Sequence, residues 1–342
     1  MPENRQSIPQ RAPGGVAIAG VGSSLPERVL TNKDLEGMMD TSDEWIRQRT
    51  GIQQRHIITE PEESTASLAV VAGRVAVEDA KLDPADVDHV IVATMTPDMP
   101  TPSISSMVAA ELGCGTIGAL DVNAACSGFV YGLNVAHEFI RGGVAKNVLL
   151  IGADTLSRMV RFNTAGRSTA VLFGDAAGAV ALRATDDTTK GVLAQSMHSD
   201  GKGAKHLYVP CQLHQLTEAE GGNESLLNQV HMNGQAVFRF AVKTFPELIA
   251  QTLERVGLQA GDIDHYVCHQ SNMRILDAAR DRFGIDASKM RVNIDRYGNT
   301  VAASVPLVFD ELKREGRLAE GQRVMFLGFG AGLTWASSLW QL

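Results

Sequence analysis

Three residues that lie far apart in the sequence have side chains suited to acyl transfer. The first is Cys126, which follows a strand-like run and precedes a helix-like run ending near Arg141. A thiol at the start of a helix meets unpaired N–H groups and the positive end of the helix dipole, which lower its pKa. We therefore expect Cys126 to be a reactive nucleophile, although a buried apolar role is the default for any cysteine.

The other two residues lie in the second half of the chain. His269 directly follows a run typical of a buried strand, and Asn299 lies at a strand-to-helix transition. Each has a simpler interpretation, because a lone histidine is usually a surface or core residue and Asn favours turns and helix starts. If the two halves pack with pseudo-twofold symmetry, matching loop ends converge. Cys126 would then meet His269 and Asn299.

The order Cys, His, Asn is also that of papain-like cysteine proteases. No cysteine here is followed by the papain-type signature, and the first residues lack an export signal. The duplication described next also suits no papain fold. We therefore favour acyl transfer over proteolysis.

A weak internal duplication organises the chain. Asp86-Val-Asp-His-Val-Ile-Val recurs at Asp262, and Val148-Leu-Leu-Ile-Gly recurs as a similar run at Val324, both at an offset of 176 residues. Short strands are expected to end at Val122-Asn123 and at Val292-Asn293, where the offset is 170 residues. Helix-like stretches at 65–82, 103–112, 245–258 and 272–283 separate these runs.

Strand-like runs alternating with helical periodicity indicate βαβ units and an α/β fold of two similar halves packed in layers. We place a flexible extension at residues 1–15, the first half at 16–184 and the second at 185–342. Residues 24–63 have no counterpart in the second half and are expected to form a cap that contacts substrate.

Composition excludes several classes of protein. The net charge of −8 argues against a nucleic-acid binder. No apolar run is long enough for a membrane span, and residues 1–15 lack the apolar centre of a secretory signal, so we expect a cytoplasmic protein. The cysteines, Cys114, Cys126, Cys211 and Cys268, have no metal-binding spacing, and no metal site is expected.

The chain resembles β-ketoacyl-acyl-carrier-protein synthase III, a condensing enzyme of the thiolase superfamily, from about residue 16 to the C-terminus. The resemblance implies a duplicated thiolase-like fold. The motifs that carry it are Thr41-Ser-Asp-Glu-Trp-Ile, Arg49-Thr-Gly-Ile, Asn123-Ala-Ala-Cys-Ser-Gly-Phe, Phe173-Gly-Asp-Ala-Ala-Gly, His269-Gln-Ser-Asn, Gly298-Asn-Thr-Val-Ala-Ala-Ser-Val-Pro and Gly328-Phe-Gly-Ala-Gly.

The resemblance implies a mechanism. Cys126 takes an acyl group from acyl-CoA, with the backbone N–H groups of Cys126 and Ala331 as oxyanion hole. His269 and Asn299 then assist decarboxylation of malonyl-acyl carrier protein, and the carbanion attacks the acyl-Cys126, initiating fatty acid synthesis. No cofactor is implied.

The resemblance also implies binding residues and a homodimer. Trp45 and Arg167 would hold the adenine of CoA and Arg49 its phosphates. The pantetheine tunnel would be lined by Met232, Gly234, Phe238, Asn272 and Phe329, and acidic carrier protein would meet Arg239, Arg274 and Arg282.

Two departures from the family pattern stand out. Met99-Pro-Thr-Pro102 lacks the bulky aromatic that relatives often place beside the primer, and Ala176 replaces a common glycine. An acetyl preference therefore does not follow. Two alternatives stay open: an acyltransferase of secondary metabolism with another acceptor, and a non-catalytic carrier-binding homologue, which the intact Cys126, His269 and Asn299 disfavour.

Overall fold

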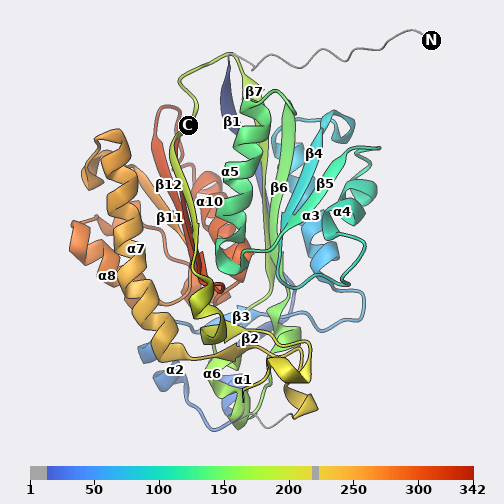
Figure 1. The fold of residues 1–342 in the computed structure, drawn as a ribbon, viewed down its shortest axis with the longest axis vertical. Helices are drawn as coiled ribbons and strands as arrows, with labels where there is room; N and C mark the ends of the chain where they lie inside the picture. The colour runs from blue at the N-terminus through green and yellow to red at the C-terminus, as the bar shows by residue number, and fades with distance from the viewer. Residues whose placement is uncertain (1–13, 218–222) are drawn as a thin grey trace.

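The computed structural model describes residues 14–217 and 223–342. Residues 1–13 of the expected N-terminal extension lie outside this described part. Five layers follow one another across the molecule: outer helices, a sheet, two central helices, a second sheet and outer helices again (Figure 1). The α/β architecture expected from the alternating pattern is confirmed.

The first sheet has the strand order β1-β7-β6-β4-β5. Its strands β4, β5 and β6 run parallel, whereas β7 is antiparallel to β6 and to β1. Its strands and the helices between them are β1 (Gly15–Ser24), α3 (Thr65–Asp79), β4 (His89–Ala93), α4 (Ile104–Leu112), β5 (Gly118–Val122), α5 (Gly128–Arg141), β6 (Asn147–Asp154), α6 (Arg167–Ala170) and β7 (Ala176–Thr185).

The second sheet has the order β11-β12-β13-β8, with β11 and β12 parallel and the other pairs antiparallel. A small two-stranded sheet pairs β9 with β10. The elements of this half are β8 (Gly191–Ser199), β9 (Leu207–Tyr208), β10 (His231–Met232), α7 (Gly234–Val256), β11 (His265–Cys268), α8 (Met273–Phe283), α9 (Ile294–Tyr297), α10 (Ser304–Arg314), β12 (Arg323–Gly330) and β13 (Thr334–Gln341).

The two sheets repeat the same strand register. Val92 pairs with Ile151 between β4 and β6, and Cys268 pairs with Leu327 between β11 and β12. Both residues of the second pair lie 176 positions after those of the first, as the duplicated runs require.

The short strand expected to end at Val292-Asn293 is absent, and that prediction was wrong. The Gln270 side chain takes the place of a neighbouring strand there. Its Oε1 accepts from Asn293 N at 3.1 Å and its Nε2 donates to Arg291 O at 3.4 Å. The Arg291 C=O and the Asn293 N–H are thus hydrogen-bonded without a neighbouring strand, and the chain passes from Asn293 directly into α9.

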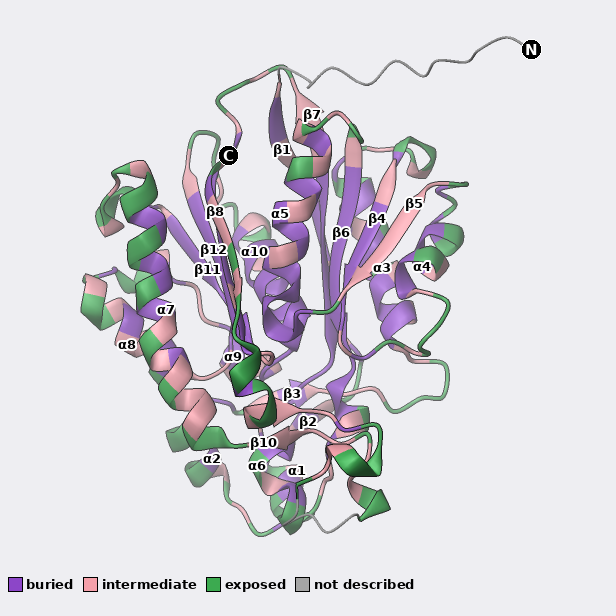
Figure 2. Cartoon of the chain, viewed as in Figure 1, coloured by how far each residue is buried: buried purple, intermediate pink, exposed green. Residues whose placement is uncertain are grey.

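The central helices α5 and α10 lie between the sheets. Figure 2 shows that α5 is buried along most of its length, whereas α7 and α8 expose their outer sides to solvent. Side chains of α5, α10 and both sheets, among them Phe129, Leu133, Phe309 and Phe326, form one apolar core. In the described part of the chain, no helix is long and apolar enough to cross a membrane.

The expected cap, residues 24–63, contains β2 (Val29–Thr31), α1 (Asn32–Glu36), α2 (Asp43–Thr50) and β3 (Gln54–His56). Arg55 fixes it to the body of the protein, because its fully buried guanidinium donates to Leu30 O, Asn32 Oδ1 and Val171 O. Burial lowers the pKa of Arg55 to about 10. The cap therefore has a fixed position over the carboxyl ends of the sheets, where ligands bind in α/β proteins (Figure 1).

Candidate active site

A cavity of about 520 Å³ leads inward from the cap to Cys126. Its lining joins residues from the cap, from both sheets and from α7 and α8. Among them are the predicted residues Trp45, Arg49, Cys126, Met232, Gly234, Phe238, His269, Asn272, Arg274, Asn299 and Phe329.

Cys126 lies in a single 3-10 turn, residues 125–127, that leads directly into α5. Ala125 adopts the left-handed conformation, with φ of +46°, and Asn123 Oδ1 accepts from its N–H at 3.4 Å. Gly330 from the end of β12 packs on this turn so closely that a Cβ there would lie 2.8 Å from Cys126 Cβ and 2.9 Å from Cys126 N. We call residues 123–127 the nucleophile turn.

The expected lowering of the Cys126 pKa is wrong. Cys126 is only 5% exposed. Burial, with a further contribution from the Asp154 carboxylate, raises the pKa of its thiol to about 12. Sequence inspection identified the helix start but could not show that the sulfur lies below the surface, where a thiolate loses its solvation.

Asn299 occupies a second turn of the same shape, residues 299–303, which leads into α10. Val301 has φ of +52°, and Asn299 Oδ1 accepts from Val301 N at 3.0 Å. Since the oxygen of the amide is engaged, its Nδ2 is the group left to donate into the cavity. The Asn299 backbone pairs with Leu172 and Gly174 at 2.9 and 3.0 Å. We call residues 299–303 the amide turn.

The two turns are structural equivalents at the offset of 176 residues. Asn123 corresponds to Asn299, Ala125 to Val301 and Cys126 to Ala302. The sequence comparison had matched Asn123 with Asn293 instead, and that alignment was wrong. The signal that could have corrected it was already present, because Asn299 keeps the offset of the flanking strands and Asn293 does not.

His269 immediately follows β11 and is 1% exposed. Burial lowers its pKa to about 3, so the imidazole is neutral at physiological pH. The ring lies edge-on to Phe329, with centroids 5.4 Å apart. A neutral imidazole in an apolar setting can donate one hydrogen bond without readily giving up a proton.

Aromatic and cationic groups form the mouth of the cavity. The guanidinium carbon of Arg167 lies 5.2 Å from the centroid of the Trp45 ring, and that of Arg49 lies 5.8 Å from it. Arg167 does not line the main cavity; it donates to Asp40 O at 2.6 Å. Asn272 Nδ2 donates to Arg49 O at 3.0 Å and so joins α8 to the end of α2.

The three arginines predicted to meet carrier protein are all exposed, on α7 and α8. Arg274 lines the cavity, and its guanidinium carbon lies 5.2 Å from the centroid of the Phe238 ring. Arg239 neighbours Phe238 on α7, while Arg282 lies two turns of α8 beyond Arg274. Arg280 is paired with Asp277 at 2.7 Å.

A second, apolar cavity of about 30 Å³ adjoins the other side of Cys126. Ala331 lines it, as do Met95, Leu156, Phe173 and Val230. The sequence analysis missed this cavity because its lining comes from eight separated segments. It also missed Asp154, a buried carboxylate at the end of β6, although the 176-residue offset pairs Asp154 with Gly330 of a predicted motif.

Comparison with known families identifies the chain's relatives. Residues 120–201 match the family 3-oxoacyl-[acyl-carrier-protein] synthase III, and residues 253–342 match the C-terminal domain of the same family. The β-ketoacyl-[acyl-carrier-protein] synthase III of Caldanaerobacter subterraneus is 46% identical over 94% of this chain and 96% of its own. That of Xanthomonas campestris is 45% identical over 94% of this chain and 97% of its own.

The chain belongs to the β-ketoacyl-[acyl-carrier-protein] synthase III family. The crystal structure of the Aquifex aeolicus synthase III superposes with a TM-score of 0.88 at 38% identity, covering 96% of this chain and all of that one. The predicted family, thiolase-like fold and class of enzyme, a condensing acyltransferase, are thus confirmed.

A specialised relative is also similar. The priming β-ketosynthase of the R1128 polyketide pathway has a TM-score of 0.88 at 34% identity, with 98% of each chain covered. This identity is lower than the 45–46% shared with the synthase III enzymes, so the alternative of a secondary-metabolism acceptor is not favoured. Within residues 14–217 and 223–342, no group of three or more His, Cys, Asp or Glu residues could hold a metal ion.

Proposed function

We propose that Cys126 accepts an acyl group from acyl-CoA and condenses it with malonyl-acyl carrier protein, the first condensation of fatty acid synthesis. One observation carries this proposal: a single long cavity ends at a buried thiol and brings His269 and Asn299 to the same place. The nucleophile comes from the first half of the chain, and the imidazole and amide donors come from the second half.

In the first step, Cys126 Sγ attacks the thioester carbonyl of acyl-CoA. A new C–S bond forms, the bond to the CoA sulfur breaks, and the Cys126 proton leaves with the CoA thiol. The N–H groups of Cys126 and Ala331 stabilise the negative oxygen of the intermediate. The closeness of Gly330 to the nucleophile turn supports this assignment, because only a residue without a side chain lets the two backbones approach.

In the second step, malonyl-carrier protein loses CO₂ as its C–C bond breaks. His269 Nε2 and Asn299 Nδ2 donate to the thioester oxygen while the enolate forms. Its carbon then attacks the acyl carbonyl, and Cys126 leaves as the thiolate and is reprotonated. The low pKa of His269, a result of burial, keeps its donor neutral, so the carbanion is not quenched by a proton. These steps require no resident cofactor.

The cavity fits the arm shared by CoA and carrier protein. Phe238, Met232 and Phe329 supply apolar walls, Gly234 allows close approach, and Asn272 offers a polar contact. Arg49 meets phosphate, and Arg239, Arg274 and Arg282 meet acidic carrier protein. Adenine between Trp45 and Arg167 needs two van der Waals spacings of about 3.5 Å each. The Arg167 guanidinium now lies 5.2 Å from the centroid of the Trp45 ring, which is too close to admit adenine between them, so Arg167 must move outward when CoA binds.

We also propose a cytoplasmic homodimer. β5 is an edge strand of its sheet, with all five residues only half-buried, and its outer edge has backbone groups available for another strand. Pairing with β5 of a second copy would satisfy them. The exposed Met99, 42% accessible, lies in the loop between β4 and α4, which precedes β5 in the chain.

The proposal is tested by intact mass after incubation with a panel of acyl-CoAs, followed by peptide mapping. We expect one acyl adduct on Cys126 and none in Cys126→Ala. Cys268→Ala is the matched control, because Cys268 is equally buried yet does not line the cavity, and it should acylate normally. An adduct that persists in Cys126→Ala, or no adduct from any acyl-CoA, would overturn the assignment.

A further inference from the structure

The buried carboxylate of Asp154 touches neither substrate nor a reacting atom in the steps above, although its charge adds to the raised pKa of the Cys126 thiol. It is fully buried at the end of β6 and lines neither the main cavity nor the small apolar one. Burial raises its pKa to about 6, although four hydrogen bonds oppose this shift. Burying a carboxylate this deeply is costly unless hydrogen bonds or an opposite charge compensate for its lost solvation.

Asp154 joins both sides of the active site. Its Oδ2 accepts from Ala302 N, in the amide turn, at 3.0 Å. Its Oδ1 accepts from Met95 N at 2.9 Å and from the hydroxyls of Thr96 and Thr94 at 3.0 and 3.2 Å. Met95 lines the small apolar cavity, and Ala302 is three residues from Asn299. One carboxylate thus connects the wall of the small apolar cavity beside Cys126 with the turn that carries the proposed donor of the second step.

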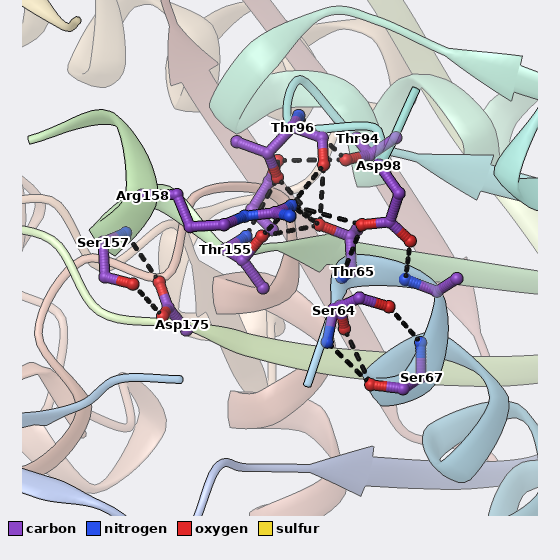
Figure 3. A network of polar contacts seen from close by, with 12 residues as sticks. Ser64, Thr65, Ser67, Thr94, Thr96, Asp98, Thr155, Ser157, Arg158 and Asp175 are labelled. Carbon is purple, nitrogen blue, oxygen red and sulfur yellow. Dashed lines mark hydrogen bonds and ion pairs between the residues drawn. The ribbon is translucent and has the colours of Figure 1, made fainter. Parts of the chain in front are cut away.

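The partners of Asp154 are themselves held in place. The Thr96 hydroxyl accepts from Thr155 N at 2.9 Å, and the Thr65 hydroxyl lies 2.7 Å from that of Thr155. Arg158 donates to the Thr155 hydroxyl at 2.6 Å and to Asp98 at 3.2 Å, which closes a dense polar network around the start of α3 (Figure 3). The Asp154 carboxylate is therefore held firmly on the side where Met95 and Thr96 donate to it.

The duplication shows what Asp154 does for the amide turn. Gly330 is its equivalent in the other half and packs against Cys126, the equivalent of Ala302. At the nucleophile turn, no side chain from position 330 caps the Cys126 N–H, which is left for the oxyanion. At the amide turn, the same place is filled by a carboxylate that caps Ala302 N. That bond holds a turn whose Val301 is in a conformation unfavourable for a β-branched residue.

We propose that Asp154 is a positioning residue for decarboxylation: it fixes the amide turn and thereby aims Asn299 Nδ2 at the malonyl thioester. The inference rests on the proposed function. An asparagine cannot replace the carboxylate, because every partner of Asp154 is a donor. In Asp154→Asn the amide nitrogen, itself a donor, would face either Ala302 N or the donors on Met95 and Thr96. A displacement of the donor by about 1 Å lowers the rate on the order of 100-fold.

The test separates the two steps. Asp154→Asn should acylate from acyl-CoA within about threefold of wild type, whereas its rate of malonyl-carrier protein decarboxylation should fall about 100-fold at unchanged KM. Asp310→Asn is the control: Asp310 is equally inaccessible and lies on α10, but it accepts from Ser23 and Arg314, away from the site. It should keep the wild-type ratio of the two rates.

A second variant keeps the test decisive if Asp154→Asn folds poorly. Thr94→Val removes the 3.2 Å donor to the same carboxylate, together with the acceptor of the 3.1 Å bond from Thr96 N, and leaves the other three donors to Asp154 in place. Decarboxylation should fall several-fold with acylation intact. If both steps fall in parallel in the two variants, or decarboxylation is unchanged, Asp154 is only structural. Failure of the proposed function has a different signature, because wild type itself would then form no acyl-enzyme.

Discussion

The nucleophile turn and the amide turn have one backbone shape and opposite chemistry. Each has an Asn side chain that accepts from the N–H two residues later, a left-handed residue at that position and a helix that follows. They differ at the next position, Cys126 against Ala302, and in what packs on them, Gly330 against Asp154. A duplicated scaffold can therefore divide two reaction steps between its halves by a few substitutions.

The residue packed on each turn also determines which groups of that turn can contact a substrate in the cavity. Gly330 places no side chain over the nucleophile turn, and Cys126 lines the cavity. In the proposed mechanism, the Cys126 N–H and Sγ are therefore free to meet the acyl group. Asp154 closes the equivalent position at Ala302, so the amide turn contributes only its Asn299 side chain. In the proposed mechanism, the same fold thus provides an open anion site at the nucleophile turn, whereas the equivalent position at the amide turn is filled by Asp154.

The largest effect should come from the donors of the second half. His269→Ala and Asn299→Ala should each lower malonyl-carrier protein decarboxylation by roughly 10²- to 10³-fold, because each removes a donor to the developing negative oxygen. Acylation of Cys126 should persist. Decarboxylation is measured as CO₂ release and acylation by intact mass.

His265→Ala and Asn293→Ala serve as controls for these two variants. Both residues are buried in the same half and neither lines the cavity, so both steps should continue. Should His269→Ala or Asn299→Ala fail at acylation instead, the division of labour between the turns would be reversed.

A smaller effect is expected when the nucleophile turn is crowded. In Gly330→Ala, the new methyl would lie 2.8 Å from Cys126 Cβ, so the turn must shift. Acylation should fall about 100-fold, as for a displacement near 1 Å. Gly201→Ala, where nothing lies within 4 Å of the new atom, should behave as wild type in the same mass assay. Normal acylation in Gly330→Ala would mean that close backbone packing is not needed.

The smallest effect concerns the pKa of the Cys126 thiol, which burial raises and the dipole of α5 lowers. Burial raises the pKa of this thiol to about 12. Below that pKa the thiolate fraction rises about tenfold for each unit of pH. Alkylation of ligand-free enzyme by iodoacetamide, mapped to Cys126 by peptide, should therefore keep rising from pH 7 to pH 10. A plateau near neutral pH would show that the dipole of α5 prevails.

Much of the fold was predictable because the chain repeats itself. Apolar strand runs at a constant offset predicted two parallel sheet cores, and both sheets have the same register. The prediction failed at Val292-Asn293, where a side chain, Gln270, takes the place of a strand. Local sequence cannot reveal such a substitution, because the partner lies about twenty residues away.

The sequence by itself determined the family, the enzyme class and the three residue types gathered at the site. Motif order and composition are properties of the amino-acid sequence, so the family and enzyme class follow from them without any three-dimensional information. Tertiary structure alone decided the burial of Cys126 and the contact of Asp154 with the amide turn, where it accepts from Ala302 N. These depend on how two halves pack, and solvation and hydrogen-bond partners exist only once distant segments are brought into contact.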